Sequence, residues 1–219
     1  MTTTYGPAAP LRAAPFPAVP YRTAALYTSA YLDELAQAAA TIDPQSLDRA
    51  TEVLLDAYTQ RNIVFSCGNG GSAAVANHLQ CDHLKGVRSG TDIQSRVISL
   101  SSSIELLTAI ANDVGYHDAF AYQLRAQSQP GDVLIVISSS GKSPNIIRAL
   151  QWACANDLRT IALTGFDGGG ARSMAEIAIH VESANYGIVE DLHQSIMHAM
   201  AQYIRQTRMS ADAIASSTF

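Results

Sequence analysis

Long apolar runs, signal sequences and paired cysteines are all missing from this chain of 219 residues. No apolar run approaches the roughly 18 to 20 residues that a membrane-spanning helix needs. The first residues lack a basic segment followed by an apolar one, so no secretory signal is predicted. The three cysteines, Cys67, Cys81 and Cys154, form no Cys-x-x-Cys pair. These absences predict a reduced, cytoplasmic protein with no membrane partner.

Charge is scarce as well. Charged residues make up 15% of the chain, against about 25% in an average soluble domain. A surface rich in Ala, Ser and Gln would explain this, and so would surface covered in an oligomer; we favour the oligomer. The formal net charge of −5 argues against binding nucleic acid through overall charge. Hydrophobic residues make up 47%, which excludes global disorder.

Proline is concentrated at the start of the chain, where residues 1–22 have neither helical nor strand periodicity. This Pro/Ala-rich segment predicts an extended arm. Residues 23–208 predict a single domain, beginning with a helix over 23–41 and a second helix capped by Asp43 with Pro44 in its first turn. Residues 209–219 predict a frayed tail.

The rest of the domain alternates between strand-like and helical patterns. Strands are predicted over 62–66, 96–100, 132–138, 160–164 and 177–182. Helices are predicted over 73–85, 104–112, 118–128, 145–156, 171–175 and 189–208. Such alternation predicts an α/β fold with three layers, in which helices cover both faces of a doubly wound parallel sheet of about five strands. The run 133–137 is apolar at every position, as expected for a central strand.

Two loops rich in small residues follow strands of this sheet. They read GNGGS over 68–72 and SSSGKS over 138–143, and neither fits the GxGxxG or GxxxxGK[ST] templates for nucleotides. Small residues let backbone N–H groups approach an anion, and a helix N-terminus adds partial positive charge. An ordinary turn explains the first loop equally well, whereas the serines of the second favour a phosphate ester. A third glycine-rich turn, 165–170, is interpreted as a connector.

Proton-transfer candidates occur on two predicted helices. His78 and Asp82 are four residues apart and share a helix face, so they form a metal site, an acid–base pair or only a surface pair. The last helix carries Glu190, His193 and His198. Glu190 and His198 are eight residues apart, roughly 12 Å along an ideal helix. This distance argues against a metal ion bound by both residues, but it suits a groove that holds an extended sugar.

Several segments together resemble the sugar isomerase (SIS) family over roughly residues 26–205. They are GNGGSAAVANHLQCD, AIANDVGYHDAF, GDVLIVISSSGKSPNII, IALTGFDGG and VEDLHQSIMH. The resemblance implies a flavodoxin-like sheet and a homotetramer with active sites at subunit interfaces. It also implies an isomerase that converts sedoheptulose 7-phosphate to D-glycero-D-manno-heptose 7-phosphate through an enediol.

The resemblance also implies roles for individual residues. His198 is implied as the histidine that moves a proton, and His78 as a ligand for zinc. The residues implied to bind substrate are Ser138, Ser139, Ser140 and Ser143 at the phosphate, Asn69, Gly70, Gly71 and Ser72 along the cleft, and Asn112 and Asp113 at the hydroxyls.

Two positions depart from the family pattern. Asp82 stands where the family has its acid/base glutamate, and Glu190 stands where it has a glutamine. A displacement of about 1 Å can lower a rate about a hundredfold, so the shorter Asp82 does not simply inherit the role. Both exchanges keep oxygen ligands. We hypothesise that they occur together, that the chain relies more on a metal, and that zinc or a similar divalent ion is held by His78, Asp82, Glu190 and His198.

For the reaction we expect His198 to act as the base and Asp82 as its counterpart. Two alternatives stay open at this stage. The chain is either an isomerase of another ketose phosphate, or a phosphosugar-binding or regulatory protein of the same family without catalysis. The chain keeps His78, an acid at position 82 and His198, and this favours an enzyme over a protein that only binds phosphosugars.

Overall fold

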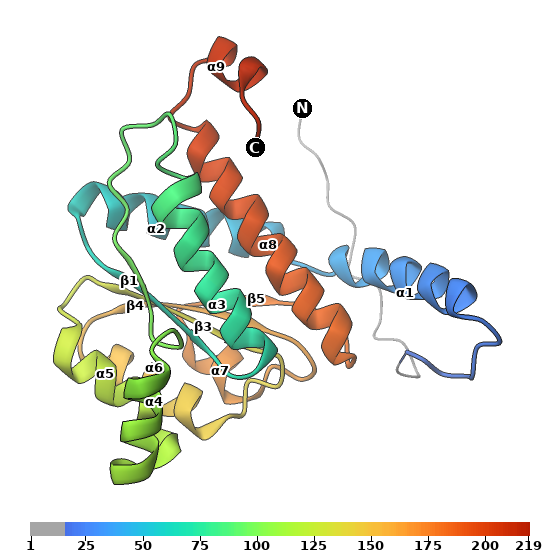
Figure 1. Cartoon of the computed structure of the whole chain (residues 1–219), viewed down its shortest axis with the longest axis horizontal. Coiled ribbons are helices and arrows are strands. Elements are labelled where there is room, and N and C mark those ends of the chain that lie inside the picture. The colour runs from blue at the N-terminus through green and yellow to red at the C-terminus, as the bar shows by residue number, and fades with distance from the viewer. Residues whose placement is uncertain (1–15) are drawn as a thin grey trace.

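The structure of the protein is a computed structural model that describes residues 16–219 (Figure 1). Most of the arm predicted over 1–22 therefore lies outside the described residues. Its last part, 16–22, forms neither helix nor strand. The Phe16 ring lies 5.3 Å from the ring of Tyr27, and the Phe16 carbonyl accepts a hydrogen bond from Asn185. The end of the arm thus packs against helical residues of the same chain.

Five parallel strands form one sheet in the order β2-β1-β3-β4-β5. This order is that of flavodoxin-like folds, as predicted. The strands are β1 (Val64–Gly68), β2 (Val97–Ser99), β3 (Val133–Ser138), β4 (Arg159–Thr164) and β5 (Ile177–His180). The helices are α1 (Ala24–Ala39), α2 (Pro44–Gln60), α3 (Gly71–Cys81), α4 (Ile104–Ile110), α5 (Ala119–Gln127), α6 (Pro144–Ala155), α7 (Gly169–Met174), α8 (Tyr186–Gln206) and α9 (Ala211–Ser216).

The sheet separates two hydrophobic cores. Along β3, Ile135 and Ile137 pack on the side covered by α2, α3 and α8, while Leu134 and Val136 pack on the side covered by α5 and α6. All four side chains are buried, because successive residues of a strand point to opposite faces. The predicted three-layer arrangement is therefore confirmed (Figure 1).

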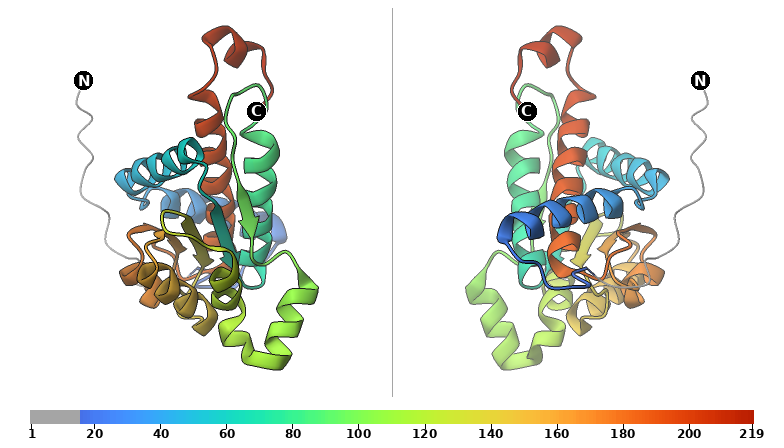
Figure 2. Two further views of the ribbon diagram at one scale, coloured as in Figure 1. Left: turned by 90° about the vertical axis from the view of Figure 1, so that its left-hand side faces the viewer. Right: turned by 90° about the vertical axis from the view of Figure 1, so that its right-hand side faces the viewer.

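The helices α3 and α8 lie side by side in all three views (Figures 1 and 2). They run in the same direction. Near their starts, Gly71 of α3 meets Glu190 of α8. Further along, Asp82, directly after α3, meets His198 of α8. Asn185 caps α8 by accepting a hydrogen bond from the backbone of Ile188. This parallel pair carries the histidine and carboxylate candidates.

The first two helices begin where predicted. The Thr23 side chain caps α1, and Asp43 caps α2. Yet α1 buries only Ala38 among its residues. Leu26 and Leu32, two apolar side chains of this helix, are 56% and 55% exposed. Exposed leucines on a helix keep the expectation of an oligomer open.

Three segments differ in detail from the predictions. Strand β1 spans Val64–Gly68 rather than 62–66, and α3 begins already at Gly71. The helices predicted over 73–85 and 104–112 each end in a π-helical turn, η1 (Asp82–Gly86) and η2 (Ala111–Gly115), and a 3₁₀ turn η3 (Tyr116–Asp118) follows the second. Such π turns often occur at functional sites, and these two carry Asp82, Asn112 and Asp113.

The segment 209–219, predicted to fray, contains the short helix α9, which Ser210 caps. Arg205 holds the segment in place, because its guanidinium donates to the carbonyl of Thr218 and lies over the ring of Phe219. The sequence did not predict this order, because a contact made by one aromatic residue, Phe219, produces no periodic pattern. None of the helices within residues 16–219 is both long and apolar enough to cross a membrane.

Candidate active site

The turn between β1 and α3 is tight and requires glycine. A Cβ at Gly68 would lie 2.5 Å from the backbone of Ser72, and Gly70 has a φ of +54°. Small residues therefore let the backbone fold over the end of β1. The turn places the N-terminus of an 11-residue helix at the carboxyl edge of the sheet, where ligands of open α/β sheets bind.

Asn69 in this turn is held rigidly by two neighbours. Its amide exchanges two hydrogen bonds with the buried Asn145 amide, at 2.9 and 2.8 Å. Tyr116 donates a third hydrogen bond, 2.7 Å long, to the same Asn69 oxygen. Asn145 lies in the first turn of α6, so these contacts join the glycine turn to the serine loop.

The serine loop Ser138–Ser143 contains hydroxyls that stabilise the loop itself and hydroxyls that have no protein partner. Ser138 and Ser140 accept hydrogen bonds from backbone N–H groups of the loop itself. The Ser139 hydroxyl is buried without any partner in the described residues, and Ser143 makes no side-chain cap bond to α6. An unpaired buried hydroxyl is destabilising unless a ligand satisfies it. Two uncommitted hydroxyls at a helix N-terminus suit an anion such as phosphate.

The turn 165–170, which the sequence analysis interprets as a connector, supports this loop directly. The Gly165 N–H donates to the carbonyl of Ser139, and the Ala171 N–H donates to the carbonyl of Gly141. Gly141 has a φ of +63°, and a Cβ there would lie 1.9 Å from the carbonyl oxygen of Gly168. Neighbouring Lys142 points outward, 2.6 Å from Asp167. The third turn thus fixes the serine loop rather than only joining two elements.

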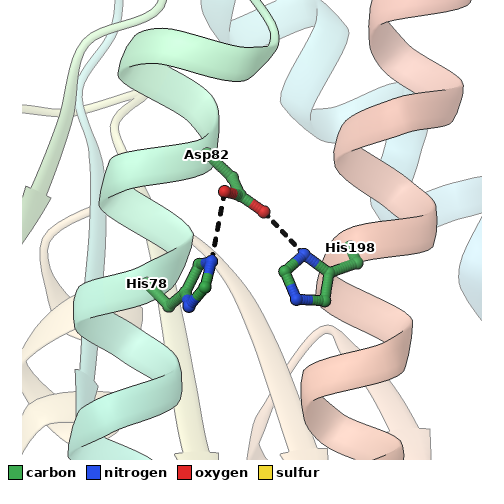
Figure 3. A group of neighbouring side chains, drawn as sticks. All are labelled: His78, Asp82 and His198. Carbon is green, nitrogen blue, oxygen red and sulfur yellow. Dashed lines mark hydrogen bonds and ion pairs between the residues drawn. The ribbon is translucent and has the colours of Figure 1, made fainter. Parts of the chain in front are cut away.

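The structure brings three of the four predicted metal ligands together (Figure 3). The Asp82 carboxylate lies between two imidazoles: Oδ2 is 2.7 Å from Nδ1 of His198, and Oδ1 is 3.3 Å from Nε2 of His78. The two rings meet edge to face with their centres 4.8 Å apart. The Asp82 side chain is 24% exposed and the two imidazoles 40–49%, so the group is open to a ligand.

The protonation of His198 follows from its two neighbours. A carboxylate only accepts hydrogen bonds, so Nδ1 of His198 carries a proton and donates it to Asp82. In the neutral ring Nε2 is then an acceptor, and the Gln194 amide nitrogen lies 2.8 Å from it. A carboxylate that orients an imidazole in this way supports its use as a base. Gln194 was not predicted, although it lies one helical turn before His198.

A cavity of about 450 Å³ opens beside Asp82 and His198. Lys85 and Arg205 contribute positive charge to its wall. The ring of Phe219, the last residue, completes the wall, and the Arg205 guanidinium lies 4.8 Å from its centre. The C-terminal segment therefore forms part of the boundary of the space next to the histidine–carboxylate group.

Glu190, the fourth predicted ligand, lies apart from that group. A Cβ built on Gly71 would be 2.2 Å from its Oε2, so its carboxylate sits against the glycine turn at the start of α3. His198 is eight residues further along α8, roughly 12 Å on an ideal helix. Within one chain, the structure does not bring Glu190 to the other three residues.

Asn112 and Asp113 are exposed on η2 and hydrogen-bonded to each other, at 2.7 Å. A hydrogen bond joins their segment to the glycine turn, because Tyr116 donates to Asn69. Asn145 and Tyr116 were not predicted as site residues, although both occur in the segments that carry the resemblance. Only their contacts reveal their part in positioning Asn69.

The remaining titratable groups near these elements serve the interior. Burial lowers the pKa of His83 to about 4 and that of His193 to about 4, so both rings are neutral near pH 7. Burial raises the pKa of the Cys67 thiol, which excludes a reactive thiolate there. His180 bonds to the Thr164 hydroxyl at 2.9 Å.

The histidine–carboxylate group fits a divalent metal by its chemistry. Its two imidazoles and one carboxylate offer ligand atoms that all lie within 4.8 Å of one another. Nitrogen and oxygen donors of these types bind zinc, and catalytic zinc sites use three protein ligands and leave one position open. The three residues His78, Asp82 and His198 therefore suffice for such a site without Glu190.

The chain is similar in sequence and in structure to known proteins. The sequence pattern of the SIS domain family matches residues 27–165. A phosphoheptose isomerase from Alteromonas mediterranea is 38% identical over 179 residues, which cover 80% of this chain and 89% of that protein. Among solved structures, the phosphoheptose isomerase from Neisseria gonorrhoeae is 32% identical with a TM-score of 0.77, over 84% of this chain and all of that one. The phosphoheptose isomerase from Francisella tularensis is 28% identical with a TM-score of 0.78, over 84% and 99%.

Proposed function

The chain belongs to the SIS domain family, and we propose that it is a phosphoheptose isomerase that converts sedoheptulose 7-phosphate into D-glycero-D-manno-heptose 7-phosphate. Isomerases of this name are similar to it over most of its length. The single observation that favours catalysis over mere binding is the Asp82 carboxylate bonded between His78 and His198. A protein that only binds a phosphosugar has no need for an oriented imidazole.

The serine loop binds the phosphate. The uncommitted hydroxyls of Ser139 and Ser143 and the N-terminus of α6 donate to its oxygens, while Ser138 and Ser140 hold the loop in shape. The glycine turn 69–72 lines the sugar chain, with Asn112 and Asp113 at its hydroxyls. The phosphate thus holds the sugar in the site equally in the ground state and in the transition state.

The isomerisation moves a proton between C1 and C2 through an enediol. His198 has the geometry of the base, because Asp82 fixes its Nδ1 proton, so that Nε2, where the Gln194 amide donates in this structure, is the atom that would accept the proton of the substrate. Asp82 is the counterpart that stabilises the imidazolium formed in the reaction. Gln194 holds the ring in the same orientation from the other side.

The residues that would hold a metal here are His78, Asp82 and His198. When bound, a divalent ion such as zinc would polarise the carbonyl of the sugar. The part of Glu190 in a metal site, expected from the sequence, finds no support in the distances within one chain.

The dimensions of the chain support a homotetramer with shared active sites. Asp82 lies eleven residues beyond Gly71, roughly 16 Å along the helix. A heptose 7-phosphate spans roughly 9 Å from C2 to phosphorus when fully extended, at ordinary bond lengths. A sugar anchored in one serine loop therefore does not reach the histidine–carboxylate group of the same chain. A second copy that brings its own group to the loop completes the site, and the exposed Leu26 and Leu32 of α1 offer it a contact surface.

The three cysteines are free thiols; Cys67 is buried and the other two are exposed. A reducing compartment suits such a chain. The cytoplasmic location and the lack of a nucleic-acid partner stay predictions.

The function is tested by incubating the purified protein with sedoheptulose 7-phosphate and following the aldose by NMR, beside a panel of shorter ketose phosphates. Turnover of the heptulose phosphate alone supports the proposal. Turnover of another ketose instead would make the chain a different isomerase. Binding of these sugars without any turnover would make it a phosphosugar-binding protein.

A further inference from the structure

We propose that Tyr58 and His83 form a buried pair that positions Asp82 for catalysis, by fixing the π-helical turn from which Asp82 reaches His198. The role rests on the proposed isomerase function and adds two positioning residues to it. Neither side chain lines the cavity beside Asp82 and His198. Both residues act through the backbone of η1 (Asp82–Gly86).

Tyr58 of α2 and His83 of η1 are hydrogen-bonded in the interior of the protein. The bond joins the Tyr58 hydroxyl and Nδ1 of His83, and the centres of the two rings lie 5.9 Å apart. Tyr58 is 5% exposed and His83 is 0% exposed. The other ring nitrogen of His83, Nε2, is buried without a partner within residues 16–219. In the described part of the chain, the ring therefore depends on Tyr58 for its hydrogen bonding.

The surroundings of this pair are apolar. A cavity of about 20 Å³ beside the His83 ring is otherwise lined by leucine, isoleucine and methionine side chains. A hydrogen-bonded polar pair in such a place contributes little net stability, because two apolar groups of the same shape would be about as stable. Buried polar groups instead favour one arrangement of the elements that carry them, since another arrangement leaves them unpaired. The pair therefore specifies how η1 lies against α2.

Three hydrogen bonds hold η1 where the chain leaves α3. The Val87 N–H donates to the Asp82 carbonyl at 2.8 Å, which closes the π turn. The buried Ser95 hydroxyl donates to the His83 carbonyl at 2.6 Å. The third bond is that between Tyr58 and His83, which joins the turn to α2. Loss of the Tyr58 hydroxyl would therefore release η1 from a neighbouring helix and leave the turn to its backbone bonds.

Two consecutive residues of η1 meet two consecutive residues of α8. Oδ2 of Asp82 lies 2.7 Å from Nδ1 of His198 (Figure 3), and His83 lines the small apolar cavity together with Met197. The Asp82 side chain is partly exposed, whereas His83 is fully buried. A rotation of η1 that moved the His83 ring from its place would therefore also turn the Asp82 carboxylate away from His198.

The short side chain of Asp82 makes the position of η1 decisive. Its carboxyl carbon is bonded directly to Cβ, so its oxygens follow each shift of the backbone closely. A glutamate, which the family resemblance places at this position, has one more rotatable bond with which to compensate for such a shift. A displacement of about 1 Å can lower a rate about a hundredfold. A chain with aspartate at position 82 therefore depends on a firmly held turn.

The test compares the wild type with Tyr58→Phe, which keeps the aromatic ring and removes the hydroxyl. With sedoheptulose 7-phosphate, kcat should fall at least about tenfold, part of the roughly hundredfold loss that a displacement of about 1 Å causes. KM should stay within about twofold, because the serine loop is unchanged.

A second readout reports the bond between His198 and Asp82 directly. ¹⁵N NMR of the histidine rings is recorded at pH 8, where ordinary histidines are neutral, on protein dialysed against a chelator. In the wild type, the proton of His198 should lie mainly on Nδ1, which donates to Asp82. In Tyr58→Phe this tautomer should lose population. A residue that only stabilises the fold would not change the tautomer of His198.

Two further variants separate positioning from stability. The matched control is Tyr31→Phe, which removes another tyrosine hydroxyl, one that donates to Asp191 at 2.6 Å; kcat should stay within about twofold and the His198 tautomer should not change. The double variant Tyr58→Phe/His83→Leu replaces both partners by apolar groups, so its urea midpoint should return to about that of the wild type. Its kcat should stay at least about fivefold below the wild type.

Three results would each overturn the proposal. They are retention of kcat within about twofold in Tyr58→Phe, an unchanged His198 tautomer in that variant, and recovery of kcat together with stability in the double variant. A wild type without turnover would instead contradict the proposed function. The NMR comparison would then still decide whether Tyr58 positions Asp82, so the two failures are distinguishable.

Discussion

The serine loop and the histidine–carboxylate group are built in contrasting ways. The loop comes from one short segment, and its shape depends on backbone hydrogen bonds and on Gly141 at positive φ. The group joins two helices: His198 and Asp82 are 116 residues apart and meet through side chains alone. Its imidazoles are 40–49% exposed, whereas Ser138 and Ser139 are 6% and 5% exposed.

This difference predicts a division of labour. A preformed loop of buried hydroxyls contributes the same binding energy to the ground state and the transition state, so its loss should raise KM. An exposed, oriented imidazole acts only during proton transfer, so its loss should lower kcat. Three measurements test the contrast, and a fourth tests a buried histidine of α8.

The largest effect is expected from His198→Gln. Glutamine keeps a polar side chain of similar reach but cannot act as a base, so kcat should fall about a thousandfold while KM changes little. Steady-state kinetics with the heptulose phosphate measure both constants. Gln206→Ala, two turns further along α8 and exposed, is the control and should stay within about twofold. Survival of kcat within a few-fold would assign the base to another residue.

Removal of a bound metal should have the next largest effect. After dialysis against a chelator we expect at least about a tenfold loss of kcat, restored by added Zn²⁺, because the three donors suit such an ion. Metal content measured before and after dialysis checks the cause. His78→Ala should retain less metal than the wild type. If kcat is unchanged after dialysis and after addition of Zn²⁺, the histidine–carboxylate group acts by acid–base chemistry without a metal.

Ser139→Ala should affect the loop and not the chemistry. The Ser139 hydroxyl is buried without a partner, and a hydrogen bond to a charged ligand contributes about 1.5–3 kcal/mol. KM should therefore rise at least about tenfold with kcat nearly unchanged, and the protein without ligand should be no less stable. Ser173→Ala, an exposed serine on α7, is the control. A large loss of kcat with normal KM would contradict the division of labour.

The smallest effect concerns stability in acid. Burial lowers the pKa of His193 to about 4, below the ordinary value near 6.5, so the unfolded state binds the extra proton. Stability should be complete above pH 6.5 and should fall as the pH drops towards 4, by about 1.4 kcal/mol per unit for one such histidine.

Urea unfolding at pH 7, 6 and 5 checks this expectation with His193→Leu, which should lose less stability in acid than the wild type. The exposed His117 supplies the control, since His117→Asn should leave the slope unchanged. An equal slope for wild type and His193→Leu would show that other groups cause any acid lability.

Much of the fold was predictable because it depends on local patterns. The apolar run of β3 required burial on both faces, and Asp43 followed by Pro44 marked the start of α2. The serine loop was predictable because its chemistry lies in consecutive residues. Gln194 and Asn145 were not recognised, since each gains its role from one neighbour in space. The helix α9 lacked a signal because Arg205 and the chain end, rather than periodicity, hold its segment.

The sequence by itself determined the alternation of strands and helices, the two loops at the carboxyl edge and the residue types available for proton transfer, since all of these follow from neighbours along the chain. Only the tertiary structure decided which carboxylate meets which partner. Two parallel helices carry Asp82 to the histidines and Glu190 to the glycine turn. The reason is geometric: a helix spaces residues by a fixed rise, and only its packing against another helix determines what each of them faces.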